Sequence, residues 1–126
     1  MRRTGRARWT PYSDRDGRDW EDNDIRFARF ALVSTKIAAG LVDPSWAADL
    51  VHVNDWPASL VPGYVPWMGY SLPSILTIHN LASQGLFQYN TLARIGAPEQ
   101  SFNINELEFY DKVSFLKAGI VHATHQ

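Results

Sequence analysis

The sequence predicts an α/β fold in which short buried strands run parallel, as part of a Rossmann-like domain. Residues 49–53 and 73–78 are apolar runs of strand length, and residues 57–68, between them, are compatible with a helix. Strand, helix and strand in this order form a right-handed crossover, which makes the two strands parallel. Asp55 and His79 follow closely after the two runs. They should therefore emerge at the same edge of the sheet, where open α/β sheets bind ligands.

The flanking segments predict further elements of the same kind. Apolar residues recur at helical spacing over residues 24–39, and Gly40 ends that pattern. A second helical pattern covers residues 106–118. The apolar run 120–123 after it is expected to begin a third parallel strand.

Two stretches lack a regular period. Residues 79–105 are interrupted by glycine and proline, and they are expected to be irregular apart from a helical turn near 91–95. A loop region of that length is usually functional. Residues 1–20 are polar and are expected to be a loop or disordered, so the domain is expected to comprise residues 21–126.

Composition excludes several classes of protein. With 126 residues, of which 45% are apolar, the chain has enough material for one modest domain with a core. A net charge of −1 gives no reason to expect binding to nucleic acid or to a membrane surface. The absence of cysteine excludes disulfides and thiolate metal sites, and it fits a reducing compartment. No apolar stretch approaches the roughly 20 residues that span a bilayer.

Four segments carry a resemblance to a known family. They read Asp-Gly-Arg-Asp-Trp-Glu-Asp-Asn at 16–23, Val-His-Val-Asn-Asp-Trp at 51–56, Thr-Ile-His-Asn-Leu-Ala-Ser-Gln-Gly-Leu-Phe at 77–87 and Leu-Glu-Phe-Tyr-Asp-Lys-Val-Ser-Phe-Leu-Lys-Ala-Gly at 107–119. In this order and at this spacing, over roughly residues 11–123, the chain resembles the bacterial and plastid glycogen or starch synthases.

The resemblance implies a glycosyltransferase of the GT-B fold, in which two Rossmann-like domains face each other across a cleft. Such an enzyme transfers glucose from ADP-glucose, or from UDP-glucose, to the nonreducing end of an α-1,4-glucan with retention of configuration. Its partners would be the nucleotide sugar and the glucan, without a further cofactor or a metal ion. A cytoplasmic location is expected, with a plastid as the alternative; the oligomeric state is not predicted.

The chain matches only the later part of the N-terminal domain in this family. A Lys-Thr-Gly-Gly-Leu loop and the C-terminal domain, which supply most contacts to the donor, have no counterpart in the sequence. We therefore expect the isolated chain to be inactive. The alternative is a non-catalytic module, derived from such an enzyme, that binds glucan or another protein.

The resemblance assigns catalytic roles to His79 and Asp55. A neutral imidazole both donates and accepts hydrogen bonds, which suits a hydroxyl group of the transferred glucose. The Asp55 carboxylate would position sugar hydroxyl groups on the acceptor side. Its alternative role is to cap the helix that begins near Pro57. A metal site made of His52, Asp55 and His79 matches no established ligand spacing, and His52 is expected to be buried in mid-strand.

Four further residues are candidates for substrate binding. Trp56 has an indole face suited to stacking on a sugar ring, although packing in the core is the commoner fate of tryptophan. Asn80, Gln84 and Gly85 would shape the loop beside the donor, with Gly85 serving a backbone turn. The resemblance is incomplete next to these residues, because Pro57 stands where the family commonly has histidine and Ser83 where it commonly has tyrosine.

Overall fold

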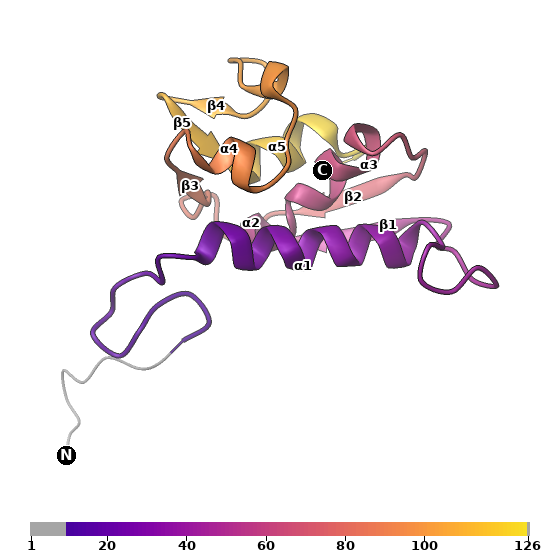
Figure 1. Ribbon diagram of the computed structural model, residues 1–126, viewed down its shortest axis with the longest axis horizontal. Coiled ribbons are helices and arrows are strands. Elements are labelled where there is room, and N and C mark those ends of the chain that lie inside the picture. The colour runs from indigo at the N-terminus through magenta and orange to yellow at the C-terminus, as the bar shows by residue number, and fades with distance from the viewer. Residues whose placement is uncertain (1–9, 126) are drawn as a thin grey trace.

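The computed structural model describes residues 10–125, and its centre is a small parallel sheet with helices packed on one face (Figure 1). Strands β1 (Val51–Asn54) and β2 (Ser74–Thr77) pair in parallel, with Val53 opposite Leu76. Side chains alternate between the two faces of such strands. Val53 and Leu76 accordingly lie in the core, whereas His52, which was predicted to be buried, is exposed on the other face.

The predicted crossover between these strands is confirmed, but it consists of two short helices. Helices α2 (Asp55–Ala58) and α3 (Leu60–Trp67) are separated at Ser59. Pro62 has no N–H to donate to the carbonyl group of Ala58, four residues earlier, so a continuous helix would lack a hydrogen bond at that point. The Ser59 hydroxyl instead donates to the backbone oxygen of Asp55 (2.7 Å).

Helix α1 (Asn23–Ala38) agrees with the predicted span and packs against α3. Its buried face consists largely of small side chains, which lets the two helix backbones approach; these are Ala28, Ala31, Thr35 and Ala38. Gly40 follows with φ +83°, and the N–H of Leu41 donates to the carbonyl oxygen of Lys36 (3.0 Å). A glycine in this conformation is the common end of a helix, as predicted.

The predicted helix over residues 106–118 is wrong. Residues Glu108–Phe109 and Lys112–Ser114 form strands β4 and β5 of a hairpin, and β5 also pairs with β3 (Leu86–Phe87). Tyr110 and Asp111 both have positive φ (50° and 65°), as a tight two-residue hairpin turn requires. This turn lacks the Asn-Gly or Asp-Gly pair that usually predicts it, and apolar residues happen to recur at helical spacing across it.

The helix in this region begins later than predicted, and the predicted third strand is wrong. Helix α5 (Phe115–His122) includes the run 120–123 that was predicted to be a strand, and it packs against α3. Gly119 lies inside α5, where an added Cβ would be 2.9 Å from the Cβ of Ser59. After α5, His125 forms a single isolated parallel bridge with Ile75 of β2.

The remaining loops contain one predicted element and two that were missed. Helix α4 (Thr91–Arg94) corresponds to the turn expected near 91–95, whereas β3 and the 3₁₀ helix Glu99–Ser101 were not predicted. The buried carboxylate of Asp24 accepts a hydrogen bond from the hydroxyl of Thr91 (2.7 Å) and lies 3.3 Å from Arg94, so α4 is fastened to α1.

Within residues 10–125, no helix is long and apolar enough to cross a membrane.

Candidate functional site

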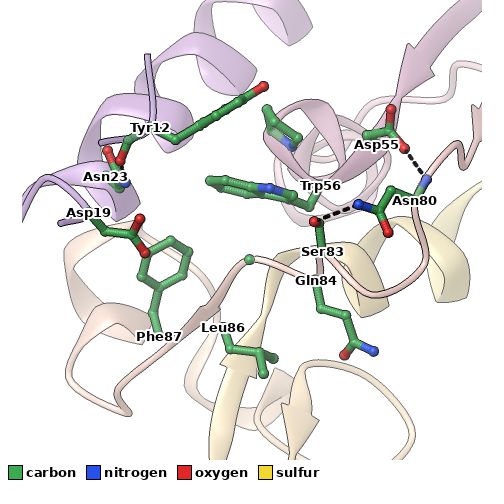
Figure 2. Close-up of a pocket in the computed structure, with 12 residues that line it drawn as sticks. Tyr12, Asp19, Asn23, Asp55, Trp56, Asn80, Ser83, Gln84, Leu86 and Phe87 are labelled. Carbon is green, nitrogen blue, oxygen red and sulfur yellow. Dashed lines mark hydrogen bonds between the residues drawn. The ribbon is translucent and has the colours of Figure 1, made fainter. Parts of the chain in front are cut away.

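A cavity of about 460 Å³ lies beside the carboxyl end of β1 (Figure 2). Its walls come from the N-terminal segment, from the start of α1, from α2 and from the loop after β2. The residues that line it are Tyr12, Asp19, Asn23, Asp55, Trp56, Pro57, Asn80, Ser83, Gln84, Gly85, Leu86 and Phe87. All the site residues predicted from the sequence except His79 are among them.

Asp55 occupies a strained backbone position where β1 turns into α2. Its φ is +59°, a left-handed conformation that costs most non-glycine residues free energy but that aspartate tolerates better than others. One carboxylate oxygen, Oδ1, accepts the backbone N–H of His79 (2.6 Å) and, at longer range, that of Asn80 (3.4 Å). The carboxylate therefore joins the ends of two neighbouring strands. Asp55 is the first residue of α2, and within residues 10–125 its side chain accepts no N–H of that helix, so the capping role is absent.

The ends of the two strands meet as the predicted parallel topology requires, but only one of the two side chains reaches the cavity. His79 is exposed, and its Nε2 lies 3.1 Å from Oδ1 of Asn54. It does not line the cavity, whereas Asp55 does. Asp55 thus holds the backbone of His79 while its own side chain lines the cavity.

The loop after His79 is held in shape by its own side chains. Oδ1 of Asn80 accepts the N–H of Ala82 (3.1 Å), and Nδ2 of Asn80 donates to the hydroxyl of Ser83 (3.1 Å). An asparagine that bonds to its own loop in this way fixes a turn. Both ends of the Asn80 amide are engaged, so Asn80 shapes the cavity wall, and Ser83 takes part where the resembled family commonly has tyrosine.

Trp56 packs directly on the backbone of Gly85. A Cβ added to Gly85 would lie 2.4 Å from Cε3 of Trp56, and φ at Gly85 is +62°. The indole also contacts aromatic rings from four other parts of the chain, those of Tyr12, Phe27, Phe87 and Phe115. Trp56 is therefore part of an aromatic cluster, as considered from the sequence, and it also presents surface to the cavity, where its stacking on a sugar stays a prediction.

The backbone N–H groups in the first turn of α5 hold the Gln84–Gly85 part of the loop. The N–H of Phe115 donates to the carbonyl oxygen of Gly85 (3.0 Å), and that of Leu116 donates to the carbonyl oxygen of Gln84 (3.0 Å). Ser114 caps the helix through its hydroxyl, which accepts the N–H of Lys117 (3.1 Å). Among the described residues, the side-chain amide of Gln84 has no hydrogen-bond partner, so it is available to a ligand.

The N-terminal segment supplies a wall that the sequence did not predict. Tyr12 stacks at a tilt on Trp56, with ring centroids 5.7 Å apart, and its backbone oxygen accepts Nδ2 of Asn23 (2.8 Å). Asp19 forms an isolated antiparallel β-bridge with Ser13 in the same segment, and it lines the cavity. Two features of the sequence could have indicated this wall: the aromatic residue Tyr12 within a polar segment, and the family resemblance of residues 16–23. Residues 1–9 of the predicted N-terminal segment lie outside the described residues.

The charge of the cavity indicates which chemistry it suits. Its only charged lining residues within 10–125 are Asp19 and Asp55, both acidic, and no lysine or arginine faces it. Carboxylates accept hydrogen bonds from hydroxyl groups but repel phosphate groups. No group of three histidine or acidic side chains suited to a metal ion occurs in the part of the chain that the structure describes.

The fold and the site define a class: a parallel α/β domain with a polar and aromatic pocket at the carboxyl ends of its strands. A sequence profile of the starch synthase catalytic domain matches residues 3–126. The chain therefore belongs to the starch synthase catalytic domain family, as the resemblance indicated.

Individual relatives agree with this assignment. Glycogen synthase 1 of Bradyrhizobium diazoefficiens is 66% identical over 115 residues, which are 91% of this chain and 25% of that protein. Glycogen synthase of Pseudomonas savastanoi pv. phaseolicola is 51% identical over 116 residues, which are 92% of this chain and 24% of that protein. The chain thus spans about a quarter of the length of these relatives.

A solved structure shows the same fold. The catalytic domain of Starch Synthase IV from Arabidopsis thaliana, bound to ADP and acarbose, superposes with a TM-score of 0.68 at 21% identity. The match covers 89% of this chain and 24% of that one. The predicted α/β fold, with a parallel sheet similar to this GT-B catalytic domain, is confirmed.

Proposed function

We propose that this chain forms the sugar-binding wall of a glycogen synthase, an enzyme that transfers glucose from ADP-glucose to the nonreducing end of an α-1,4-glucan with retention. One observation carries the proposal: a cavity lined by aromatic rings, amides and two carboxylates lies at the carboxyl end of the parallel sheet. Aromatic faces and hydrogen-bonding side chains suit a neutral sugar. The names of the bacterial relatives support the same reaction and favour a cytoplasmic location over a plastid.

The proposed roles follow the geometry. His79, which does not line the cavity, would hydrogen-bond the transferred glucose, and Asp55, which lines the cavity and accepts the backbone N–H of His79, would position sugar hydroxyl groups on the acceptor side. The free oxygen of Asp55, the Gln84 amide and the Trp56 indole would contact the acceptor, in the cavity whose wall Asn80 and Gly85 shape. Positioning two reactants in this way supplies a large share of a transferase's rate.

The departing diphosphate requires positive charge that this cavity does not offer. The groups that stabilise it would come from a facing domain, as the GT-B architecture of the family implies. We therefore expect the chain to bind glucan without transferring glucose. This also makes the non-catalytic glucan-binding module the second candidate, since the cavity is built entirely from this chain.

A chimera tests the proposal. The 115 matching residues of the Bradyrhizobium glycogen synthase 1 would be replaced by the corresponding residues of this chain, and glucose transfer from ADP-glucose to glycogen would be measured. We expect turnover from the chimera and none from the isolated chain. In the chimera, His79→Ala should lower turnover far more than it lowers the melting temperature.

The matched control is His52→Ala, which removes an exposed imidazole from the neighbouring strand, where Nε2 lies 2.7 Å from the hydroxyl of Thr77. It should leave most of the turnover intact. An inactive but folded chimera, or equal losses of turnover from the two substitutions, would contradict the proposal.

A further inference from the structure

The side-chain ammonium group of Lys117 binds backbone carbonyl groups. Lys117 lies in the first half of α5 and is half-buried. Its Nζ donates to two backbone carbonyl oxygens, those of Ile104 and Glu108, at 2.5 Å each. No carboxylate in the described part of the chain lies within ion-pair distance of this ammonium group. The side chain therefore closes a segment of backbone onto α5 and does not pair with an acid.

The backbone segment held by Lys117, residues 104–108, leads into the β4–β5 hairpin. Ile104 precedes β4, and Glu108 is its first residue. Between them the carbonyl oxygen of Leu107, a fully buried residue, accepts the N–H of Ser114 at the end of β5 (2.9 Å). The ammonium group thus fixes the two ends of a short stretch whose middle is already fastened to β5.

The hairpin in turn leads to the cavity. Strand β5 pairs on its other side with β3, with Ser114 opposite Leu86. Leu86 directly follows Gly85, whose carbonyl oxygen is held by the N–H of Phe115. A continuous hydrogen-bonded path therefore connects the Lys117 ammonium group with the Gln84–Gly85 turn in the cavity wall.

We propose that Lys117 is a positioning residue, which holds the β4–β5 hairpin on α5 and thereby sets the Gln84–Gly85 turn for sugar binding. The sugar-binding part of this inference rests on the proposed function. The ammonium group suits this task because a charged donor makes stronger hydrogen bonds to carbonyl groups than a neutral one does, and it can serve both at once.

Three variants of the 126-residue chain test the inference. Lys117→Met keeps the length of the side chain but removes the donors, and Lys117→Arg keeps donors and charge. Lys112→Met is the matched control, since Lys112 lies in the same hairpin and its side chain makes no hydrogen bond within residues 10–125. Two quantities would be measured by NMR: the exchange rates of backbone amides and the dissociation constant for maltotriose.

With Lys117→Met, we expect the amides of Phe115 and Leu116 to exchange at least tenfold faster than in the unaltered chain. The amide of Met68, which donates to the carbonyl oxygen of Tyr64 at the C-terminal end of α3, should change less than twofold. The dissociation constant for maltotriose should rise at least fivefold. Lys117→Arg should restore most of both effects, and Lys112→Met should show neither.

Unchanged exchange at Phe115 and Leu116 in the Met variant would overturn the inference. So would equal acceleration at Met68, because it would show a general loss of stability. If the Met variant does not fold, Lys117→Arg decides. The positioning role would be overturned if the amides of Phe115 and Leu116 in the Arg variant exchanged faster only by the factor seen at Met68, because this would show a general loss of stability. Absence of maltotriose binding by the unaltered chain would contradict the proposed function, while the exchange rates would still decide the role of Lys117.

Discussion

Substitution of Gly85 by alanine tests the packing of the cavity wall. Gly85 and Gly96 have similar backbone conformations, with φ of +62° and +74°, so an alanine at either position carries the same left-handed strain of about 1–2 kcal/mol. They differ in their surroundings. A Cβ at Gly96 meets nothing within 4 Å, whereas at Gly85 it would lie 2.4 and 2.8 Å from two indole carbons of Trp56 and 3.2 Å from Cβ of Phe115.

The magnitude follows from this difference. Overpacking in a well-packed region costs about 1–3 kcal/mol, so Gly85→Ala should lower the free energy of unfolding by that amount more than Gly96→Ala does. Urea denaturation followed by circular dichroism measures both. Trp56→Phe, which removes the fused ring that meets the new Cβ, should recover about 1 kcal/mol when combined with Gly85→Ala, relative to the sum of the single effects.

Equal destabilisation by Gly85→Ala and Gly96→Ala would refute the reasoning. It would mean that the indole does not rest on the Gly85 backbone, and the aromatic wall of the cavity would then be wrong. Additive effects of Gly85→Ala and Trp56→Phe would lead to the same conclusion.

Three further substitutions have defined outcomes. Asp55→Ala should lower the free energy of unfolding, measured by urea denaturation, by about 2–4 kcal/mol, because it removes a charged acceptor and keeps a Cβ at positive φ. Asp55→Gly should lower it by about 1 kcal/mol less, and a smaller loss from alanine than from glycine would contradict the strained turn. Ser114→Ala should lower stability by about 0.5–2 kcal/mol through loss of the α5 cap, whereas Ser34→Ala, at a half-buried position in the middle of α1, should stay within about 0.5 kcal/mol of the unaltered chain. Equal melting temperatures of the two variants would count against the cap. Burial raises the pKa of Tyr64 from 10.0 to about 12, so the stability that the protonated phenol contributes is complete below pH 10 and is lost between about pH 10 and 12. Over this range the midpoint of urea unfolding should fall less for Tyr64→Phe than for the unaltered chain, and parallel pH profiles of the two would contradict the raised pKa.

The sheet and its crossover could be predicted because their signal is local. Apolar runs with polar ends identify β1 and β2, and the handedness rule then makes them parallel and places their ends together. That rule was sufficient to bring Asp55 and His79 to one edge, where the carboxylate of Asp55 accepts the N–H of His79. Topology alone could not show that only Asp55 of the two would line the cavity.

The hairpin and the outer wall of the cavity could not be predicted, for different reasons. The Tyr110-Asp111 turn is stable in its context, where the side chain of Glu108 accepts the N–H of Asp111 (2.7 Å), and local sequence preference does not reveal it. Tyr12 reaches the cavity through contacts with residues more than ten positions away, including Trp56. Long-range contacts of this kind leave no periodic pattern in a sequence.

The central claim is that the cavity at the end of β1 binds neutral sugar and not the diphosphate of the donor. An NMR titration of the chain with maltotriose, and separately with inorganic pyrophosphate, tests it most directly. The account predicts saturable shifts of the backbone amides of Asn80, Gln84 and Gly85 with maltotriose and none with pyrophosphate. Shifts of these amides with pyrophosphate but not with maltotriose would contradict it.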